Sequence, residues 1–137
     1  LNGGIMINTN KKYWFSEGER IMMLEQSTKH IPKVEVDVFG GLMVDYARGK
    51  GVSAIIRGMR TMADFEGEMA LAGMNKHIAP EIETILLITS HEWQHLSSSL
   101  VKEAALMGVD LDGLIPEPAH EIVKNRFNMM EEGEVKL

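Results

Sequence analysis

The sequence predicts an α/β fold with a parallel, doubly wound sheet flanked by helices, and two observations support this prediction. Short apolar stretches and longer amphipathic stretches alternate four times along the 137 residues. That order is typical of strand–helix–strand units joined by right-handed crossovers. In addition, TILLIT (84–89) is an apolar run with no polar face, as expected of a strand buried on both sides of a parallel sheet.

The four predicted strands are short and mostly apolar, and they set where a site is expected. In a doubly wound sheet, ligands bind past the carboxyl ends of the strands. The loops that leave the strands are therefore the places to search for functional side chains. The strands are GGIMI (3–7), VEVDVF (34–39), VSAII (52–56) and TILLIT (84–89).

Helix starts and stops are marked by capping residues. Ser16 and Glu19 form a capping-box signature for a helix that runs to His30, and Thr61 and Asp64 form a second one. Glycine ends the short helix over 41–51. The glycine that ends it is Gly49 or Gly51. Three further helices are predicted: one from Thr61 to Ile78 with an apolar stripe of Phe65, Met69 and Ala72, one from the serines to Gly108, and a last one from Pro118 that carries Val123, Phe127 and Met130.

Composition narrows the class of protein. The chain is long enough for one domain with a core. A formal net charge of −6 argues against a broad nucleic-acid surface. No cysteine is present, which excludes disulfides and thiolate chemistry and fits a cytoplasmic protein. No apolar run approaches the ~20 residues of a membrane span, so no membrane association is expected.

Cations and hydroxyls follow three of the predicted strands. Lys11 and Lys12 follow the first, Arg57 and Arg60 the third, and the serine run 97–99 the fourth. The last two groups stand directly before a helix. Arginine presents paired donors to phosphate, and a helix N-terminus adds N–H groups and a favourable dipole. The pattern therefore predicts a phosphate or nucleotide site at the strand exits.

Simpler interpretations exist for each part of this pattern. The serines alone are typical of a solvated loop with a helix cap, and the lysines of a soluble surface. Arg57 and Arg60 alone could pair with carboxylates of the next helix. Those carboxylates are Asp64, Glu66 and Glu68.

Other chemistries have weaker support. His91 and His95 are four residues apart but lie in a predicted loop without a third ligand, so metal binding is disfavoured. There is no G-x-S-x-G elbow, Walker loop or G-x-G-x-x-G. The eleven methionines are read as flexible core filler, although Met43, at a strand exit, could also contact a ligand.

Motifs over most of the chain resemble bacterial phosphopantetheine adenylyltransferases. That family carries I-R-G-x-R, a D-F-E-x-E helix with a later alanine, an N-[KR] pair and a W-x-x-[IL]-S-S block. The matching segments here are Ile56 to Arg60, Asp64 to Glu68 with Ala72, Asn75–Lys76, Trp93 to Glu103, KKYWFSEGER (11–20) and FGGLMVDYA (39–47).

The resemblance implies a Rossmann-like nucleotidyltransferase fold and a reaction in coenzyme A biosynthesis. ATP and 4′-phosphopantetheine would give dephospho-coenzyme A and pyrophosphate, with Mg2+ accompanying ATP. The substrate phosphate would attack the α-phosphorus in line, without a covalent enzyme intermediate. The resemblance also implies a cytoplasmic homohexamer and coenzyme A as a feedback ligand.

The resemblance also implies roles for individual residues. Lys11 and Arg60 would be catalytic, with Lys11 steering the attacking phosphate. The ATP-binding residues would be Gly58, Met59, Arg60, Glu68, Trp93, Gln94, His95, Leu96, Ser97, Ser98 and Ser99. The substrate-binding residues would be Lys11, Leu42, Met43, Arg57, Leu71, Asn75 and Glu103, although Glu103 could equally be a surface residue near Lys102.

One family signature has no counterpart. Members open with a strand, a T-F-D-P loop and a [TN]-x-G-H turn that supplies a threonine and a histidine to the transition state, and no Gly-His pair occurs in 1–137. We therefore expect a single nucleotidyltransferase domain over 1–137 that is incomplete at its N-terminus and lacks its first strand. Loss of one such donor typically costs ~3–4 kcal/mol of transition-state stabilisation. Two alternatives remain open: a noncatalytic module that binds nucleotide or coenzyme A, and a nucleotidyltransferase for another phosphate acceptor.

Overall fold

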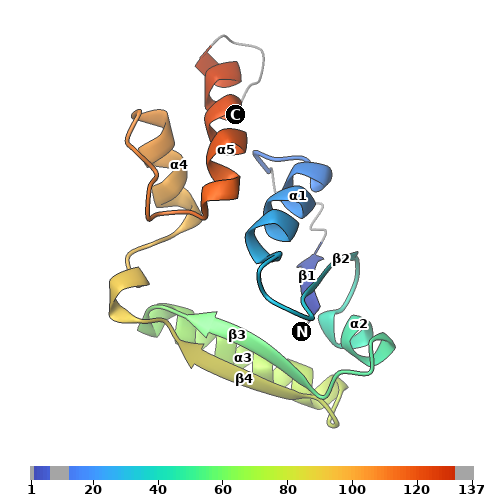
Figure 1. Ribbon diagram of the computed structural model, residues 1–137. Helices are drawn as coiled ribbons and strands as arrows, with labels where there is room; N and C mark the ends of the chain where they lie inside the picture. Colours follow the sequence, from blue (N-terminus) through green and yellow to red (C-terminus); the bar gives the residue numbers. More distant parts are fainter. Residues whose placement is uncertain (1, 7–12, 132–137) are drawn as a thin grey trace. The chain divides into compact units, whose positions relative to one another are not determined.

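The computed structural model describes residues 2–6 and 13–131, and side chains over 13–128 (Figure 1). Strands and helices alternate as predicted. In chain order they are β1 (Asn2–Met6), α1 (Glu17–Thr28), β2 (Glu35–Phe39), α2 (Met43–Gly49), β3 (Ala54–Met59), α3 (Met62–Ile78), β4 (Glu83–Ile88), a 3-10 turn (His91–Trp93), α4 (Ser98–Leu106) and α5 (Glu117–Glu131). The chain forms two compact units: unit 1 is Leu1–Val38 with Leu96–Leu137, and unit 2 is Phe39–His95.

The α/β class and the parallel pairing are confirmed. β3 and β4 are parallel neighbours, in register from Ala54 opposite Glu83 to Met59 opposite Ile88. β1 pairs with β2 in a second sheet. The strands of the described residues are thus assigned to two pairs, β1–β2 and β3–β4.

The third strand lies further along the chain than predicted. The apolar run suggested 52–56, whereas β3 spans Ala54–Met59. Arg57, Gly58 and Met59 are therefore strand residues, and only Arg60 of the predicted loop follows the strand. The reason is the ladder to β4, which continues to Met59 regardless of side-chain polarity.

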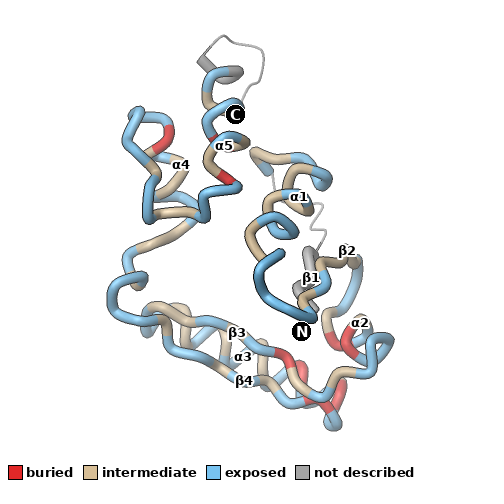
Figure 2. Tube along the Cα trace, in the orientation of Figure 1, coloured by how far each residue is buried: buried red, intermediate tan, exposed pale blue. Residues whose placement is uncertain are grey.

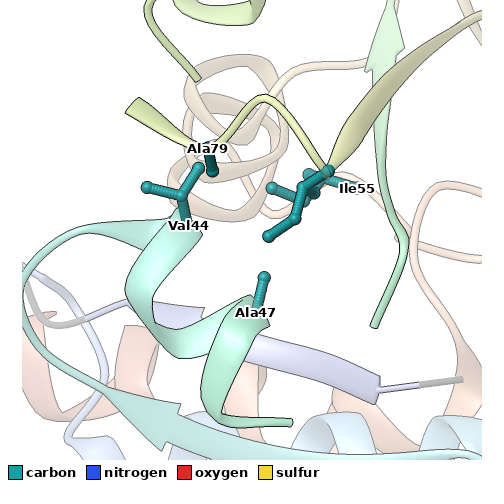
Figure 3. Packing of buried hydrophobic residues seen from close by; sticks show 5 residues of the cluster. Val44, Ala47, Ile55 and Ala79 are labelled. Atoms are coloured by element: carbon teal, nitrogen blue, oxygen red, sulfur yellow. The ribbon is translucent and has the colours of Figure 1, made fainter. Parts of the chain in front are cut away.

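The core of unit 2 lies where α2, the start of β3 and the end of α3 meet (Figure 3). Gly51, with φ +65°, turns the chain from α2 into β3, which only glycine does without strain. Of the two glycines predicted to end this helix, Gly51 is therefore the one that turns the chain away from it. The buried residues are Val44, Ala47, Ile55, Ala79 and Ile82.

Only one face of the β3–β4 pair is covered within unit 2. α3 packs against both strands on that face (Figure 1). On the other face Ile56, Ile85 and Leu87 are 53%, 44% and 52% exposed. The prediction that 84–89 is buried on both sides is therefore wrong for the described residues. Met69 is also exposed, so its prediction as part of the apolar stripe of α3 is wrong. The side of α3 that faces the strands carries Glu68 and Asn75, which contact Arg57 of β3 and Thr84 of β4.

Unit 1 is built from helices that are far apart in sequence. α5 packs against α1 and α4. The predicted capping box at Ser16 is present: Ser16 Oγ accepts from the Glu19 N–H at 3.3 Å, and Glu19 accepts from the Ser16 N–H. Buried residues are sparse here (Figure 2), and they include Ala105, Ala119 and Val123.

None of the helices that the structure describes combines the length and the apolar character that a membrane span requires.

Candidate active site

The carboxyl ends of β3 and β4 lie side by side. The Thr89 N–H donates to the Met59 carbonyl at 2.9 Å, directly after the last paired residues of the two strands. The segments that begin at Arg60 and Thr89 therefore leave the sheet next to each other. This confirms the predicted convergence for two of the four strand exits. The first exit, with Lys11 and Lys12, lies outside the described residues, so convergence there stays a prediction.

Arg57 is held by Glu68. Its Nε and Nη2 each donate to one carboxylate oxygen of Glu68 at 2.7 Å, a bidentate pair between β3 and α3. The hydrogen bond to Glu68 raises the pKa of Arg57, and the hydrogen bond from Arg57 lowers the pKa of Glu68. Both groups are thus charged. The simpler interpretation, that Arg57 pairs with the next helix, is confirmed in this structure.

Arg60 is held by Asp64, which lies one helical turn before Glu68 on α3, through a single carboxylate oxygen. Its Nε donates to Asp64 Oδ2 at 3.2 Å, and its backbone N–H donates to the same oxygen at 3.1 Å. Thr61 caps α3, with Oγ1 accepting from the Asp64 N–H at 3.1 Å. The backbone N–H of Arg60 is the main cause that lowers the pKa of Asp64. Arg60 is therefore fixed at the amino end of α3, where an anion is favoured, and Arg57 is held one helical turn further along α3.

Gly58 and Met59 complete this end of β3. Gly58 lies on the face opposite α3, and no atom lies within 4 Å of where a Cβ would stand. The backbone there is open to close approach by a ligand, as the proposed nucleotide role requires.

The segment after β4 folds back on the strand end. Gln94 Nε2 donates to the Thr89 carbonyl at 3.3 Å, and the 3-10 turn His91–Trp93 precedes it. Trp93 is 44% exposed, and His95 is also exposed. Among the residues the structure describes, no group of three or more His, Cys, Asp or Glu could hold a metal ion.

The predicted substrate-pocket residues of unit 2 differ in burial. Asn75 is 5% exposed, and its Nδ2 donates to Thr84 Oγ1 at 3.3 Å, whereas Leu42 is 53% exposed. Leu71 is half-buried, and Met43 packs against the core of unit 2. The prediction that the methionines are core filler is wrong for the exposed ones, which are Met22, Met62, Met69, Met74 and Met107.

The serine run lies in unit 1 with Leu96 and Glu103. Ser97 is the N-cap of α4, and its Oγ accepts from the Leu100 N–H at 3.1 Å. Ser98 and Ser99 are exposed in the first turn, so capping uses only one of the three hydroxyls. Glu103 is exposed on the same helix.

The sequence pattern predicts Asp64 as a capping residue and offers its pairing with Arg60 only as an alternative to a functional role of the arginine. The spacing of four residues between Arg60 and Asp64 was the available signal, since such pairs are neighbours where a helix begins.

Comparisons with known proteins agree with these features. Residues 4–104 match the cytidylyltransferase-like family model. Phosphopantetheine adenylyltransferases from Desulfatibacillum aliphaticivorans, Thermomicrobium roseum and Roseiflexus sp. are 51%, 44% and 44% identical over 82%, 88% and 86% of this chain. The chain belongs to the phosphopantetheine adenylyltransferase family. Its fold is accordingly the Rossmann-type nucleotidyltransferase fold.

Members of this family are nucleotidyltransferases that make dephospho-coenzyme A in coenzyme A biosynthesis. The chain spans 65%, 72% and 74% of the lengths of the three relatives named above, that is, about two thirds to three quarters. The match therefore covers a large part of these relatives but not all of each.

Proposed function

We propose that the protein transfers the adenylyl group of ATP to 4′-phosphopantetheine, giving dephospho-coenzyme A and pyrophosphate. One observation carries the proposal beyond family membership. Arg57 and Arg60 are both fixed at the carboxyl end of β3, beside the amino end of α3 and the exit of β4. That arrangement suits several phosphoryl groups at once, because guanidinium groups and helix N–H groups both favour anions.

The proposed mechanism needs charge neutralisation and alignment rather than a protein nucleophile. The phosphate of 4′-phosphopantetheine attacks the α-phosphorus of ATP in line, and pyrophosphate leaves. Lys11 steers the attacking phosphate, Arg57 holds it, and Arg60 stabilises charge on the nucleotide. When substrate binds, Arg57 must share its guanidinium between the phosphate and Glu68.

The remaining residues are proposed as contacts for the two substrates. The nucleotide contacts are Gly58, Met59, Glu68, Trp93, Gln94, His95, Leu96, Ser97, Ser98 and Ser99, with the serines receiving the leaving pyrophosphate. The pantetheine contacts are Leu42, Met43, Leu71, Asn75 and Glu103.

A divalent metal accompanies this chemistry, and we take it to be Mg2+. Mg2+ is commonly held by substrate phosphates with a few waters and one or two carboxylates. At this end of β3 the side chains described are arginines paired with carboxylates, a set that fits the phosphates of metal-bound ATP. When bound, the ion offsets phosphate charge.

Further features of the proposal follow the family resemblance. They are a homohexameric assembly, coenzyme A as a feedback ligand, and a cytoplasmic location. Light scattering of the whole protein tests the assembly, and inhibition of pyrophosphate release by coenzyme A tests the feedback.

Pyrophosphate release from ATP, with 4′-phosphopantetheine or other phosphate acceptors, tests the reaction. Arg60→Ala should slow turnover at least about tenfold, and Lys11→Ala should lower the rate without lowering the melting temperature. Arg48→Ala is the matched control, because Arg48 pairs with Glu81 away from these strand exits. Preference for a different acceptor would replace the proposed substrate. Nucleotide binding without turnover would favour a noncatalytic module.

A further inference from the structure

Asp64 makes an unusual double contact with Arg60. A single oxygen, Oδ2, accepts from the backbone N–H of Arg60 at 3.1 Å and from its Nε at 3.2 Å. The first contact fixes the main chain where β3 ends, and the second fixes the direction in which the guanidinium leaves it. One carboxylate therefore controls both the origin and the orientation of the arginine.

Asp64 is itself fixed by its neighbours. Its own N–H donates to Oγ1 of Thr61, the N-cap residue of α3, at 3.1 Å. Thr61 thus fixes the main chain at Asp64, and the Asp64 carboxylate in turn contacts both the main chain and the guanidinium of Arg60. Arg57, three residues before Arg60, and Glu68, one helical turn after Asp64, form a second pair.

A purely stabilising role would explain little of this geometry. The side chains of Arg60 and Asp64 are 37% and 31% exposed, and ion pairs this open to solvent usually contribute little to stability. Positioning, by contrast, depends on angle and distance, and a misplacement of about 1 Å near a reacting group can cost up to about a hundredfold in rate. The arrangement is better suited to setting the place of Arg60 than to holding the fold.

We propose that Asp64 is a positioning residue, which holds the guanidinium of Arg60 in the direction needed to meet the phosphates of ATP. The inference rests on the proposed function of this site. It assigns Asp64 no contact with substrate, so the main part of its effect on ATP binding should pass through Arg60.

A double-mutant cycle on the whole protein tests this. Asp64→Asn keeps the size and one acceptor oxygen but loses the charge, and it should raise the dissociation constant for ATP about tenfold. In an Arg60→Ala background, the same change should alter ATP binding less than about twofold. Titration calorimetry with ATP is the measurement, with melting temperature recorded alongside. Glu66→Gln, which changes an exposed carboxylate on the same helix, is the matched control and should leave ATP binding unchanged.

The outcomes separate the inference from the proposed function. Equal effects of Asp64→Asn in both backgrounds, or a fall in melting temperature that accounts for the loss, would overturn the positioning role. Wild-type protein that binds ATP but releases no pyrophosphate with 4′-phosphopantetheine would overturn the proposed reaction, while the cycle on ATP binding still decides the role of Asp64. Failure of the wild type to bind ATP would overturn both. A further check compares Asp64→Ala, which removes the carboxylate, with Asp64→Glu, which keeps it on a longer side chain. Asp64→Glu should retain part of the ATP affinity that Asp64→Ala loses.

Discussion

The two units of the molecule are built in opposite ways. Unit 2 is one continuous stretch, Phe39–His95, whose core joins elements that follow each other in sequence. Unit 1 joins two stretches from opposite ends of the chain, and its described helices are linked by an ion pair between residues 107 apart. Packing in unit 2 thus joins neighbouring stretches of chain through apolar contacts, whereas packing in unit 1 joins distant stretches and includes a long-range ion pair.

This difference matters for the site. Arg57, Arg60 and their carboxylate partners all belong to unit 2, so their geometry depends on a short, locally closed stretch of chain. The serine run belongs to unit 1. A substitution in the core of unit 2 should therefore disturb the arginines, whereas one in unit 1 should act on the serines.

The largest expected effect is Ile82→Ala in unit 2. Ile82 is 1% exposed, and truncating a fully buried isoleucine typically costs about 2–5 kcal/mol of unfolding free energy. Val123→Ala in unit 1, at 6% exposed, removes less buried apolar surface and should cost about 1–2 kcal/mol. Urea unfolding with hydrogen exchange measures both. Loss of protection in β3 and β4 on Val123→Ala alone would contradict the separation of the units.

Local features of this fold were predictable, and long-range ones were not. The caps at Ser16 and Thr61 followed from residues three positions apart. The extent of β3 did not, because the ladder to β4 carries Arg57 and Gly58 into the strand against their propensity. No pattern in the sequence indicates the ion pair between Glu19 and Arg126 either.

The same distinction between local and long-range features applies to the candidate site. That Arg60 follows the third strand and directly precedes a helix could be predicted, because it depends on residue type and order. Which carboxylate holds which arginine depends on the register of α3 against β3, which periodicity alone leaves undecided. The exposed face of β3 and β4 was also missed, since an apolar strand sequence does not specify how much of it is covered.

The next effect in size is expected for the ion pair of unit 1. Arg126 Nη2 donates to both oxygens of Glu19 at 2.6 and 2.7 Å, and the two side chains are 17% and 30% exposed. Arg126→Met should lower the unfolding free energy by about 1–3 kcal/mol, because a charge-assisted contact is lost and Glu19 keeps its charge. The loss is partly offset, since Arg126 Nε is buried with no hydrogen-bond partner among the described residues.

Arg48→Met is the matched control for this prediction. Arg48 pairs with Glu81 in unit 2, where the side chains are 42% and 56% exposed, so little change is expected. Urea unfolding of the two variants makes the comparison. Equal losses would mean that the partial burial of Arg126 adds nothing, and that unit 1 is not held by its long-range pair.

The smallest effect concerns pH, and it tests whether the two units titrate independently. Burial would raise the pKa of Glu19, but hydrogen bonds from the Ser16 N–H and from Arg126 outweigh it and lower the pKa below the ordinary 4.5. The hydrogen bond from Arg57 lowers the pKa of Glu68 in the same direction. For a carboxylate with a lowered pKa, the stabilisation is complete above about pH 4.5 and is lost as the pH falls through the native value. Stability should therefore stay level between pH 7 and pH 5 with respect to these groups and fall on further acidification.

Carboxyl NMR titration separates the two contributions. In Arg57→Met, the pKa of Glu68 should rise while that of Glu19 stays where it is, and in Arg126→Met the pKa of Glu19 should rise while that of Glu68 stays where it is. Each variant thus serves as the control for the other, because the two pairs share no residue and lie in different units. A shift of both carboxyls in either variant would mean that the units are coupled through their charges. In that case the arginines of the site would depend on the helices of unit 1 as well as on α3.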